Sequence, residues 1–208
     1  MERWVLLRKG ADFEAIGKKY QISPRLACLI RNRDVIGEEA VDRYLNGTIS
    51  DLYDGMLMKD MDKAIDILKE KILEDKKIRV IGDYDIDGVN ATYILLEGLE
   101  RLGADVDSDI PDRISDGYGL NRHLVERAYE AGVDTLITCD NGIAAADEIA
   151  YGKEMGMTVI VTDHHEVPFD EQDGEKRYRI PPADAVMDPK QPDCLYPFKG
   201  LCGAAVAY

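Results

Sequence analysis

Arg79–Gly88 reads RVIGDYDIDG, in which a short apolar run is followed by aspartates at alternate positions and a glycine. Asp83, Asp85 and Asp87 repel one another unless they are solvated or bound to a cation. If residues 78–82 form a buried strand, the aspartates lie at and just beyond its carboxyl end, where open α/β sheets bind ligands. An Asp-Gly turn explains one aspartate and the glycine, but not all three carboxylates. The stretch therefore favours a metal site that follows a strand.

The composition is that of a globular protein. The 208 residues suffice for one domain, or for one domain with a small appendage. No apolar run is long enough to span a bilayer, so we expect no membrane association. Four widely spaced cysteines without a CxxC pair are typical of reduced proteins, and we expect a cytoplasmic location. The net charge of −15 argues against binding a polyanion over the whole surface, but it allows a nucleic acid held by cations and a local basic patch.

The pattern of the chain changes near residue 50. Residues 1–50 carry apolar side chains at helical spacing, and we expect a helical N-terminal arm. Over residues 51–208 strands and helices alternate, which predicts an α/β catalytic domain. The connections are long enough for βαβ crossovers, so we expect a mainly parallel sheet of about five strands flanked by helices. Strand candidates are residues 78–82, 105–110, 135–139, 158–162 and 185–187, and helix candidates are 61–72, 89–102, 121–131 and 144–155.

The segment after the fourth strand candidate is polar. Residues 166–184 read EVPFDEQDGEKRYRIPPAD and contain three prolines, so we expect a surface loop. No convincing helix candidate follows Pro168, although the chain ends in an apolar, helix-like run at residues 204–208.

Acidic and histidine residues follow two further strand candidates. Asp140 comes directly after the strand at 135–139, and Asp163, His164 and His165 follow the strand at 158–162. Carboxylates and imidazoles without a thiolate suit Mn²⁺ or Mg²⁺ better than structural zinc. Two such ions about 3.5–4 Å apart activate water and stabilise charge on a phosphoryl group. A surface histidine pair is the alternative, but three clusters at one sheet edge favour function.

Several ordered motifs resemble a known family. DYDIDG, CDNG and TDHH, which begin at Asp83, Cys139 and Thr162, resemble the motifs of the DHH phosphoesterase superfamily. PDR at residues 111–113 with GYGL at 117–120, and the C-terminal YPFK and LCGAAVA, resemble segments of its RecJ-type exonucleases. The resemblance begins near Leu52 and continues to the last residue. It implies an α/β fold and Mn²⁺-dependent hydrolysis of phosphodiesters or phosphoanhydrides.

The resemblance also implies a set of metal ligands. Asp85 and Asp87 would be ligands from the first motif, with Asp83 close by. Asp140 would bridge two cations, which we expect to be Mn²⁺, with Mg²⁺ as an alternative. His164 would be a further direct ligand.

Other residues would act beside the metal. Asp163 would orient the ring of His164 through a hydrogen bond. His165 would face the scissile phosphate, as a hydrogen-bond donor or as the acid that protonates the leaving oxygen. Arg113 would contact a phosphate, with a surface salt bridge as the alternative. Gly203 would let the backbone approach the substrate, with ordinary helix packing as the alternative.

The chain departs from the family pattern in three places. Ile81 stands where many relatives, including the pyrophosphatases, carry a histidine. Asp188 stands where relatives usually carry asparagine, and it is either harmless or near the site. The chain ends at Tyr208, where such exonucleases continue through another ligand aspartate and a domain that grips single strands. We therefore expect an N-terminal fragment that lacks those C-terminal domains and has little or no activity by itself.

The sequence leaves three candidate functions. The first is a 5′-to-3′ exonuclease that degrades single-stranded DNA with metal-activated water in recombination and repair. The second is a DHH phosphoesterase for short oligonucleotides or cyclic dinucleotides, and the third is a non-catalytic adaptor module. The GYGL and YPFK segments and the helical arm favour the first, and the intact aspartate and histidine set argues against the adaptor.

Overall fold

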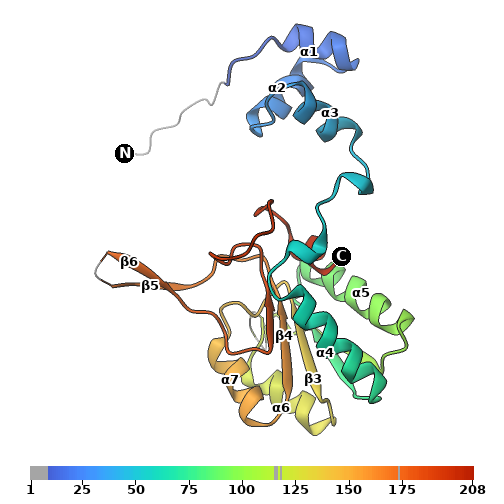
Figure 1. The fold of residues 1–208 in the computed structure, drawn as a ribbon, viewed down its shortest axis with the longest axis vertical. Helices are drawn as coiled ribbons and strands as arrows, with labels where there is room; N and C mark the ends of the chain where they lie inside the picture. Colours follow the sequence, from blue (N-terminus) through green and yellow to red (C-terminus); the bar gives the residue numbers. More distant parts are fainter. Residues whose placement is uncertain (1–8, 115–116, 118, 173) are drawn as a thin grey trace. The chain divides into compact units, whose positions relative to one another are not determined.

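The computed structural model describes residues 9–114, 117, 119–172 and 174–208, and Figure 1 shows the fold. The chain divides into two compact units, one ending at Tyr53 and the other running from Asp54 to Tyr208. The sequence-based division after residue 50 stays a prediction. Among the helices in the described ranges, none combines the length and the apolar composition that a bilayer crossing requires.

The first unit is helical, as the spacing of its apolar residues predicts. Ser23 begins the second helix, because its Oγ accepts a hydrogen bond from the amide of Leu26 at 3.2 Å. Ala27, Ile30 and Val41 are buried where the helices meet. The elements are α1 (Phe13–Tyr20), α2 (Pro24–Asn32), α3 (Glu38–Asn46) and the short 3₁₀ helix η1 (Ile49–Asp51).

The second unit is built on a parallel sheet of five strands in the order β2-β1-β3-β4-β7. The α/β fold with a mainly parallel, five-stranded sheet is therefore confirmed. The central strand β3 is buried along its whole length, which explains its continuous apolar and threonine sequence. The strands are β1 (Ile78–Ile81), β2 (Val106–Asp109), β3 (Thr135–Cys139), β4 (Thr158–Thr162) and β7 (Ala185–Met187).

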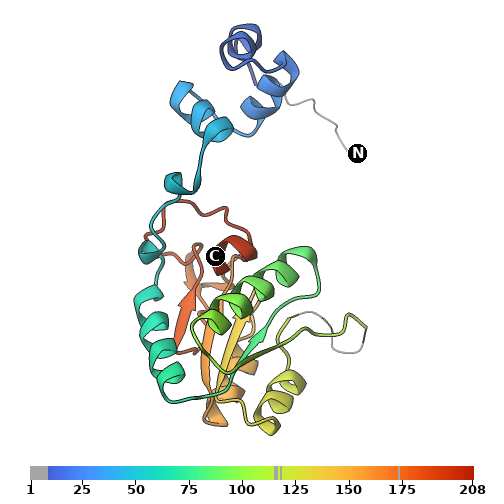
Figure 2. The same ribbon diagram turned by 90° about the vertical axis from the view of Figure 1, so that its right-hand side faces the viewer.

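Helices cover both faces of the sheet, because alternate strand residues point to opposite sides. On one face Val80 and Ile137 pack with residues of α4 (Met61–Leu73), α5 (Ile86–Arg101) and α8 (Gly203–Ala207). On the other face Leu136 and Val159 pack with residues of α6 (Arg122–Glu130) and α7 (Ala146–Glu154). Figures 1 and 2 show the sheet between these two layers. A 3₁₀ helix, η2 (Gly55–Leu57), precedes α4.

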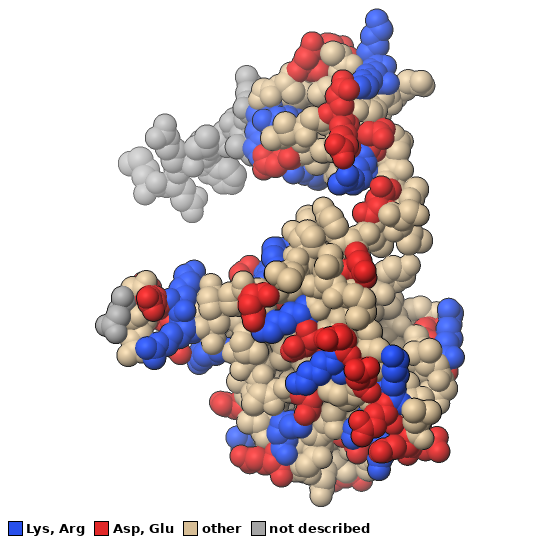
Figure 3. Space-filling model, viewed as in Figure 1, with Lys and Arg blue, Asp and Glu red and all other residues tan. Residues whose placement is uncertain are grey.

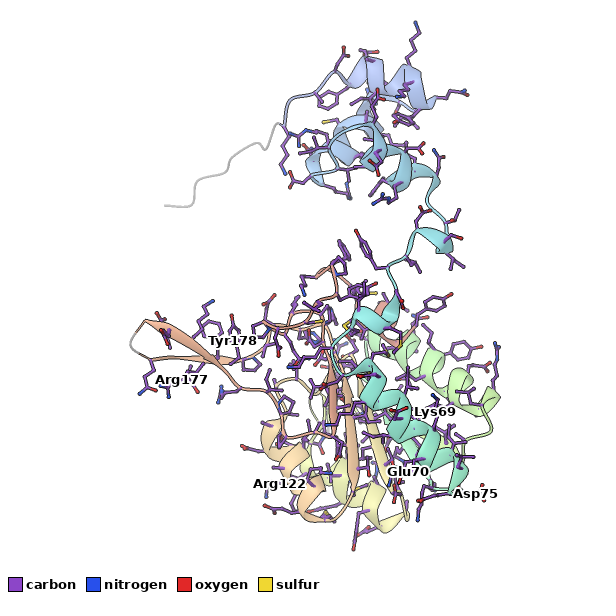
Figure 4. The ribbon with its side chains drawn as sticks, in the orientation of Figure 1. Lys69, Glu70, Asp75, Arg122, Arg177 and Tyr178 are labelled. Carbon is purple, nitrogen blue, oxygen red and sulfur yellow. The ribbon has the colours of Figure 1, made fainter. Side chains whose placement is uncertain are left out.

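The prediction of a loop over residues 166–184 is wrong in its middle part. Strands β5 (Phe169–Gln172) and β6 (Glu175–Tyr178) form an antiparallel hairpin, on which Figure 4 labels Arg177 and Tyr178. The rings of Phe169 and Tyr178 lie opposite each other with centroids 5.8 Å apart, and Lys176 Nζ is 4.1 Å from the centre of the Phe169 ring. Both strands are exposed throughout, so they carry no buried apolar alternation that a sequence pattern could reveal.

Two helices also differ from expectation. Helix α5 begins at Ile86 rather than at residue 89, because Asp85 Oδ1 accepts hydrogen bonds from the amides of Asp87 (2.8 Å) and Gly88 (3.0 Å). The first motif is thus a strand end, a helix cap and the first turn of a helix, rather than a solvated loop. No convincing helix was predicted after Pro168, but the helix-like run noted at residues 204–208 lies largely within α8, which has only five residues.

Candidate metal centre

Aspartates follow four neighbouring strands at the same height. The register pairs Ile81 with Thr138, Cys139 with Thr162, and Thr162 with Met187. Extended past the strand ends, this register aligns Asp83, Asp140, Asp163 and Asp188 across β1, β3, β4 and β7, which we call the aspartate row. Neighbouring strands lie about 4.8 Å apart, so the row brings four carboxyl groups to one sheet edge. All four residues are buried, with 0–2% of their surface exposed.

Asp83, Asp85 and Asp140 form a first group of oxygen donors, with one ligand atom from each within 4.8 Å of the others. Within the described part of the chain, both carboxylate oxygens of Asp83 are buried and lack a hydrogen-bond partner. A buried carboxylate without partners is costly, and a divalent cation would satisfy it. Oxygen donors of this kind are those that Mn²⁺ and Mg²⁺ prefer, so the group fits such a cation.

Asp140, His164 and His165 form a second group with the same spacing. His164 Nε2 lies 2.9 Å from Asp140 Oδ1 and 3.5 Å from Asp87 Oδ2. Asp140 thus belongs to both groups, which is the geometry expected of a carboxylate shared between two cations. The structure brings together the three sequence clusters that were expected to meet.

Burial and charge act differently on two of these carboxylates. Burial, followed by the charges of Asp87 and Asp85, raises the pKa of Asp140 to about 7. Burial also works to raise the pKa of Asp87. Hydrogen bonds from the amides of Ala204 and Gly203 and from the side chain of Cys202, together with the charge of His164, outweigh it and hold that pKa below its ordinary value. A cation bound at Asp140 would offset the repulsion that raises its pKa.

Asp163 orients a different histidine ring from the one expected. Its Oδ1 lies 2.7 Å from His165 Nδ1, and it reaches His164 only through the backbone amide, at 2.7 Å. Its Oδ2 accepts a hydrogen bond from the amide of Ile143 at 2.9 Å. The hydrogen bond to Asp163 raises the pKa of His165, which favours the protonated ring. This favours His165 as a proton donor rather than as a metal ligand, so that Asp140 and His164 are the ligand candidates of the second group.

Gly203 approaches carboxylates rather than open space. Its amide donates to Asp87 Oδ2 at 2.7 Å, and the amide of Ala204 donates to Asp87 Oδ1 at 2.8 Å. A Cβ at position 203 would lie 2.5 Å from Asp140 Oδ1, so no larger residue fits without a shift. The close backbone approach that was expected at Gly203 thus serves Asp87 and Asp140, and a substrate contact stays a prediction.

Arg113 lies beside the first motif. Its guanidinium is exposed and lies 4.7 Å from the centre of the Tyr84 ring. Tyr84 stands between Asp83 and Asp85 in the sequence. Its contact with a phosphate stays a prediction. Tyr118, from the GYGL segment, lies outside the described residues.

Asp188 belongs to the aspartate row. The sequence contained a signal for this position, because Asp188 directly follows the fifth strand candidate, as Asp140 and Asp163 follow theirs. Its Oδ1 accepts a hydrogen bond from the amide of Lys190 at 2.7 Å. Its Oδ2 is buried and has no hydrogen-bond partner among the residues described. Burial, and next the charge of Asp163, raise the pKa of Asp188 to about 7. Figure 3 shows other acidic side chains interspersed with basic ones on the visible face of this unit.

Comparison with curated proteins identifies relatives over nearly the whole chain. The single-stranded-DNA-specific exonuclease RecJ of Bacillus subtilis is 40% identical over 207 residues, which are 99% of this chain and 25% of the relative. RecJ of Escherichia coli is 31% identical over 209 residues, which are 100% of this chain and 34% of the relative. The chain thus spans a quarter to a third of the length of these relatives.

Solved structures agree with this result. A crystal structure of RecJ from Thermus thermophilus in complex with Mn²⁺ matches with a TM-score of 0.63 and 30% identity, over 99% of this chain and 27% of that one. A structure of exonuclease RecJ bound to manganese matches with a TM-score of 0.61 and 37% identity, over 72% of this chain and 36% of that one.

The family assignment rests on the part of the chain that carries the site. The family model described as the DHH family, N-terminal domain, matches residues 77–208, which include every strand and every residue of the two ligand groups. The chain therefore belongs to the DHH family.

Proposed function

We propose that this chain carries the metal centre of a RecJ-type exonuclease, which degrades single-stranded DNA from the 5′ end. The observation that carries the proposal is the position of Asp140, which is shared between the ligand groups Asp83–Asp85–Asp140 and Asp140–His164–His165. The orphaned oxygens of Asp83 support a cation at the first group. The RecJ relatives support the choice of substrate.

Each residue of the site receives a role in this proposal. Divalent cations, when bound, would supply an activated water and stabilise charge on the phosphate. Asp83, Asp85 and Asp87 would hold one side of the site and Asp140 would be shared, with His164 on the other side. We propose Mn²⁺ as the preferred cation, with Mg²⁺ as the alternative.

The acid in this proposal is His165. Its ring is held by Asp163 at 2.7 Å, and this hydrogen bond raises its pKa, which favours the protonated form that an acid requires. The proton would pass to a phosphate oxygen or to the leaving oxygen. Arg113, over the Tyr84 ring, would contact a neighbouring phosphate with its planar fork.

A chimera tests the activity. The chain replaces the matching quarter of the B. subtilis relative. The product is incubated with Mn²⁺ and end-labelled single strands, double strands, dinucleotides or cyclic dinucleotides. We expect mononucleotides from single strands only, starting at the 5′ end. Asp140→Ala should abolish the product, whereas Asp66→Ala, an exposed aspartate of α4, should not.

Other outcomes identify the competing functions. Cleavage confined to dinucleotides or cyclic dinucleotides indicates the small-substrate phosphoesterase, and a folded chimera without any metal-dependent product indicates the adaptor. The 208-residue chain alone is expected to show little or no activity in the same assay. A role in recombination and repair and a cytoplasmic location stay predictions.

A further inference from the structure

The first turn of α8 is fixed to the metal centre through backbone amides. Asp87 Oδ2 accepts from the amide of Gly203 at 2.7 Å, and Asp87 Oδ1 accepts from the amide of Ala204 at 2.8 Å. Hydrogen bonds from amides to a carboxylate are shorter and stronger than those between neutral groups. The side chain of Cys202 also donates to this carboxylate. The two oxygens together have four lone pairs, so these three donors leave one lone pair for a cation. The two amides thus set the plane of the Asp87 carboxylate without exhausting it.

The same turn also limits where Asp140 can lie. A Cβ on Gly203 would come within 2.5 Å of Asp140 Oδ1 and 2.7 Å of Asp140 Cβ. His164 Nε2 lies between the two carboxylates, 2.9 Å from Asp140 Oδ1 and 3.5 Å from Asp87 Oδ2. The backbone at Gly203 therefore contacts Asp87 and Asp140, the two carboxylates nearest to His164 Nε2.

The same two bonds are also those of an ordinary helix cap. A carboxylate at a helix N-terminus stabilises the helix, so Asp87 could simply cap α8. If Asp87 only caps the helix, removing any hydrogen bond of the first turn should change cation binding by about the same amount. A bond that serves the metal centre matters for cation binding only when it reaches Asp87. The amide of Ala205, which donates to the carbonyl of Cys202 at 3.1 Å, provides the matched comparison because it does not contact Asp87.

We propose that Gly203 and Ala204 are positioning residues of the metal centre, whose amides hold Asp87 ready for a divalent cation. The proposal rests on the proposed function only in taking Asp87 as a ligand. It gives the LCGAAVA segment a task that is distinct from contact with the substrate. Cation affinity and the docking of α8 are then coupled.

The sequence allows each amide to be removed alone. Residues 1–201 are prepared as a thioester and joined at Cys202 to a synthetic peptide that carries residues 202–208. In the peptide, one amide N–H at position 203, 204 or 205 is replaced by an ester oxygen, which deletes a donor and adds no side chain. The unmodified peptide gives the reference chain. Mn²⁺ binding is measured from the electron paramagnetic resonance signal of free Mn²⁺, and folding from circular dichroism.

We expect esters at 203 and 204 to weaken Mn²⁺ binding about tenfold each, the usual strength of a hydrogen bond to a charged group. The ester at 205 should leave the affinity within about twofold of the reference, although it removes a bond of α8 itself. Equal effects at all three positions, or unchanged or tighter binding at 203 and 204, would overturn the proposal.

A measurement without metal separates this inference from the proposed function. Amide hydrogen exchange at Gly203 and Ala204 is followed by NMR in Asp87→Ala and in Asp85→Ser, which retains a helix-capping hydroxyl. We expect exchange at both amides to become at least about tenfold faster in Asp87→Ala only. Unchanged exchange at both amides would overturn the proposal, whether or not the chain binds Mn²⁺. Faster exchange in a chain whose unmodified form binds no Mn²⁺ supports the contact with Asp87. In that case the metal site of the proposed function is tested by Mn²⁺ binding to the chimera, and a chimera that binds no Mn²⁺ contradicts it.

Discussion

The ends of β4 and β7 carry buried aspartates at the same height, yet the two side chains are in opposite electrostatic situations. Asp163 accepts hydrogen bonds from the amides of Ile143, His164 and His165 and lies 2.7 Å from the ring nitrogen of His165, and its pKa stays below the ordinary value. Asp188 accepts one hydrogen bond, from Lys190, and its pKa is raised to about 7. Burial is similar in both, so the number of donors decides which carboxyl group stays ionised.

The largest effect is expected from Asp163→Ala. The substitution leaves the buried amide of Ile143 without an acceptor and removes the partner of His165, so the free energy of unfolding should fall by about 3–5 kcal/mol. Urea denaturation without metal measures it. Asp193→Ala removes an exposed aspartate that pairs with Lys59, and it should change stability by less than about 1 kcal/mol. Similar losses in the two variants would contradict the assigned importance of the donors.

Asp188→Asn should act in the opposite direction. Asparagine removes a carboxyl group whose ionisation is unfavourable in the fold, so the variant should be more stable at pH 7 by about 2–4 kcal/mol. Because the folded pKa of about 7 lies above the ordinary value of 3.8, this group lowers stability as pH rises from about 4 to 7.

The sign of this effect can be checked directly by denaturation at several pH values in the presence of a chelator. The gain from Asp188→Asn should be near zero at pH 4, grow up to about pH 7 and then level off. A gain that is already complete at pH 4 would indicate a packing effect instead of a titration.

The smallest effect is expected at Asp107, on the edge strand β2. Arg79 pairs with it through two hydrogen bonds of 2.6 and 2.7 Å, which lower the pKa of Asp107. Its side chain is 35% exposed, so solvent screens the pair, and Asp107→Asn should cost less than about 1 kcal/mol. Because the folded pKa is lowered, this contribution is present above pH 3.8 and is lost as pH falls through the folded pKa. A double-mutant cycle with Arg79→Gln at pH 7 and pH 3 measures it.

Much of this arrangement could be predicted from sequence because it depends on local patterns. The strands β3, β4 and β7 begin and end where the apolar runs do, and the polar residues that follow them meet at one edge, as parallel strands require. The choice of ring by Asp163 could not be predicted, because it depends on a turn in which Asp163 Oδ1 is shared by the backbone amides of His164 and His165 and by the His165 ring.

The other differences have the same origin in contacts between distant segments. Helix α8 is short, and the amide of its first residue donates to Asp87, which lies 116 residues away in sequence. The β5–β6 hairpin depends on a pair of rings in an otherwise charged and exposed stretch. Neither leaves a periodic pattern in the sequence.

The register of the sheet also fixes where the carboxyl groups of the aspartate row lie. One residue deleted from β3 would draw Asp140 back by about 3.3 Å and turn its side chain to the opposite face, away from Asp83 and Asp163. A change of length in a crossover has no such consequence, since the strands that flank it keep their register. The segment between β4 and β7 accommodates a complete hairpin and still delivers Asp188 level with Asp163. Insertions and deletions should therefore be tolerated between strands and excluded within them, even where substitutions are accepted.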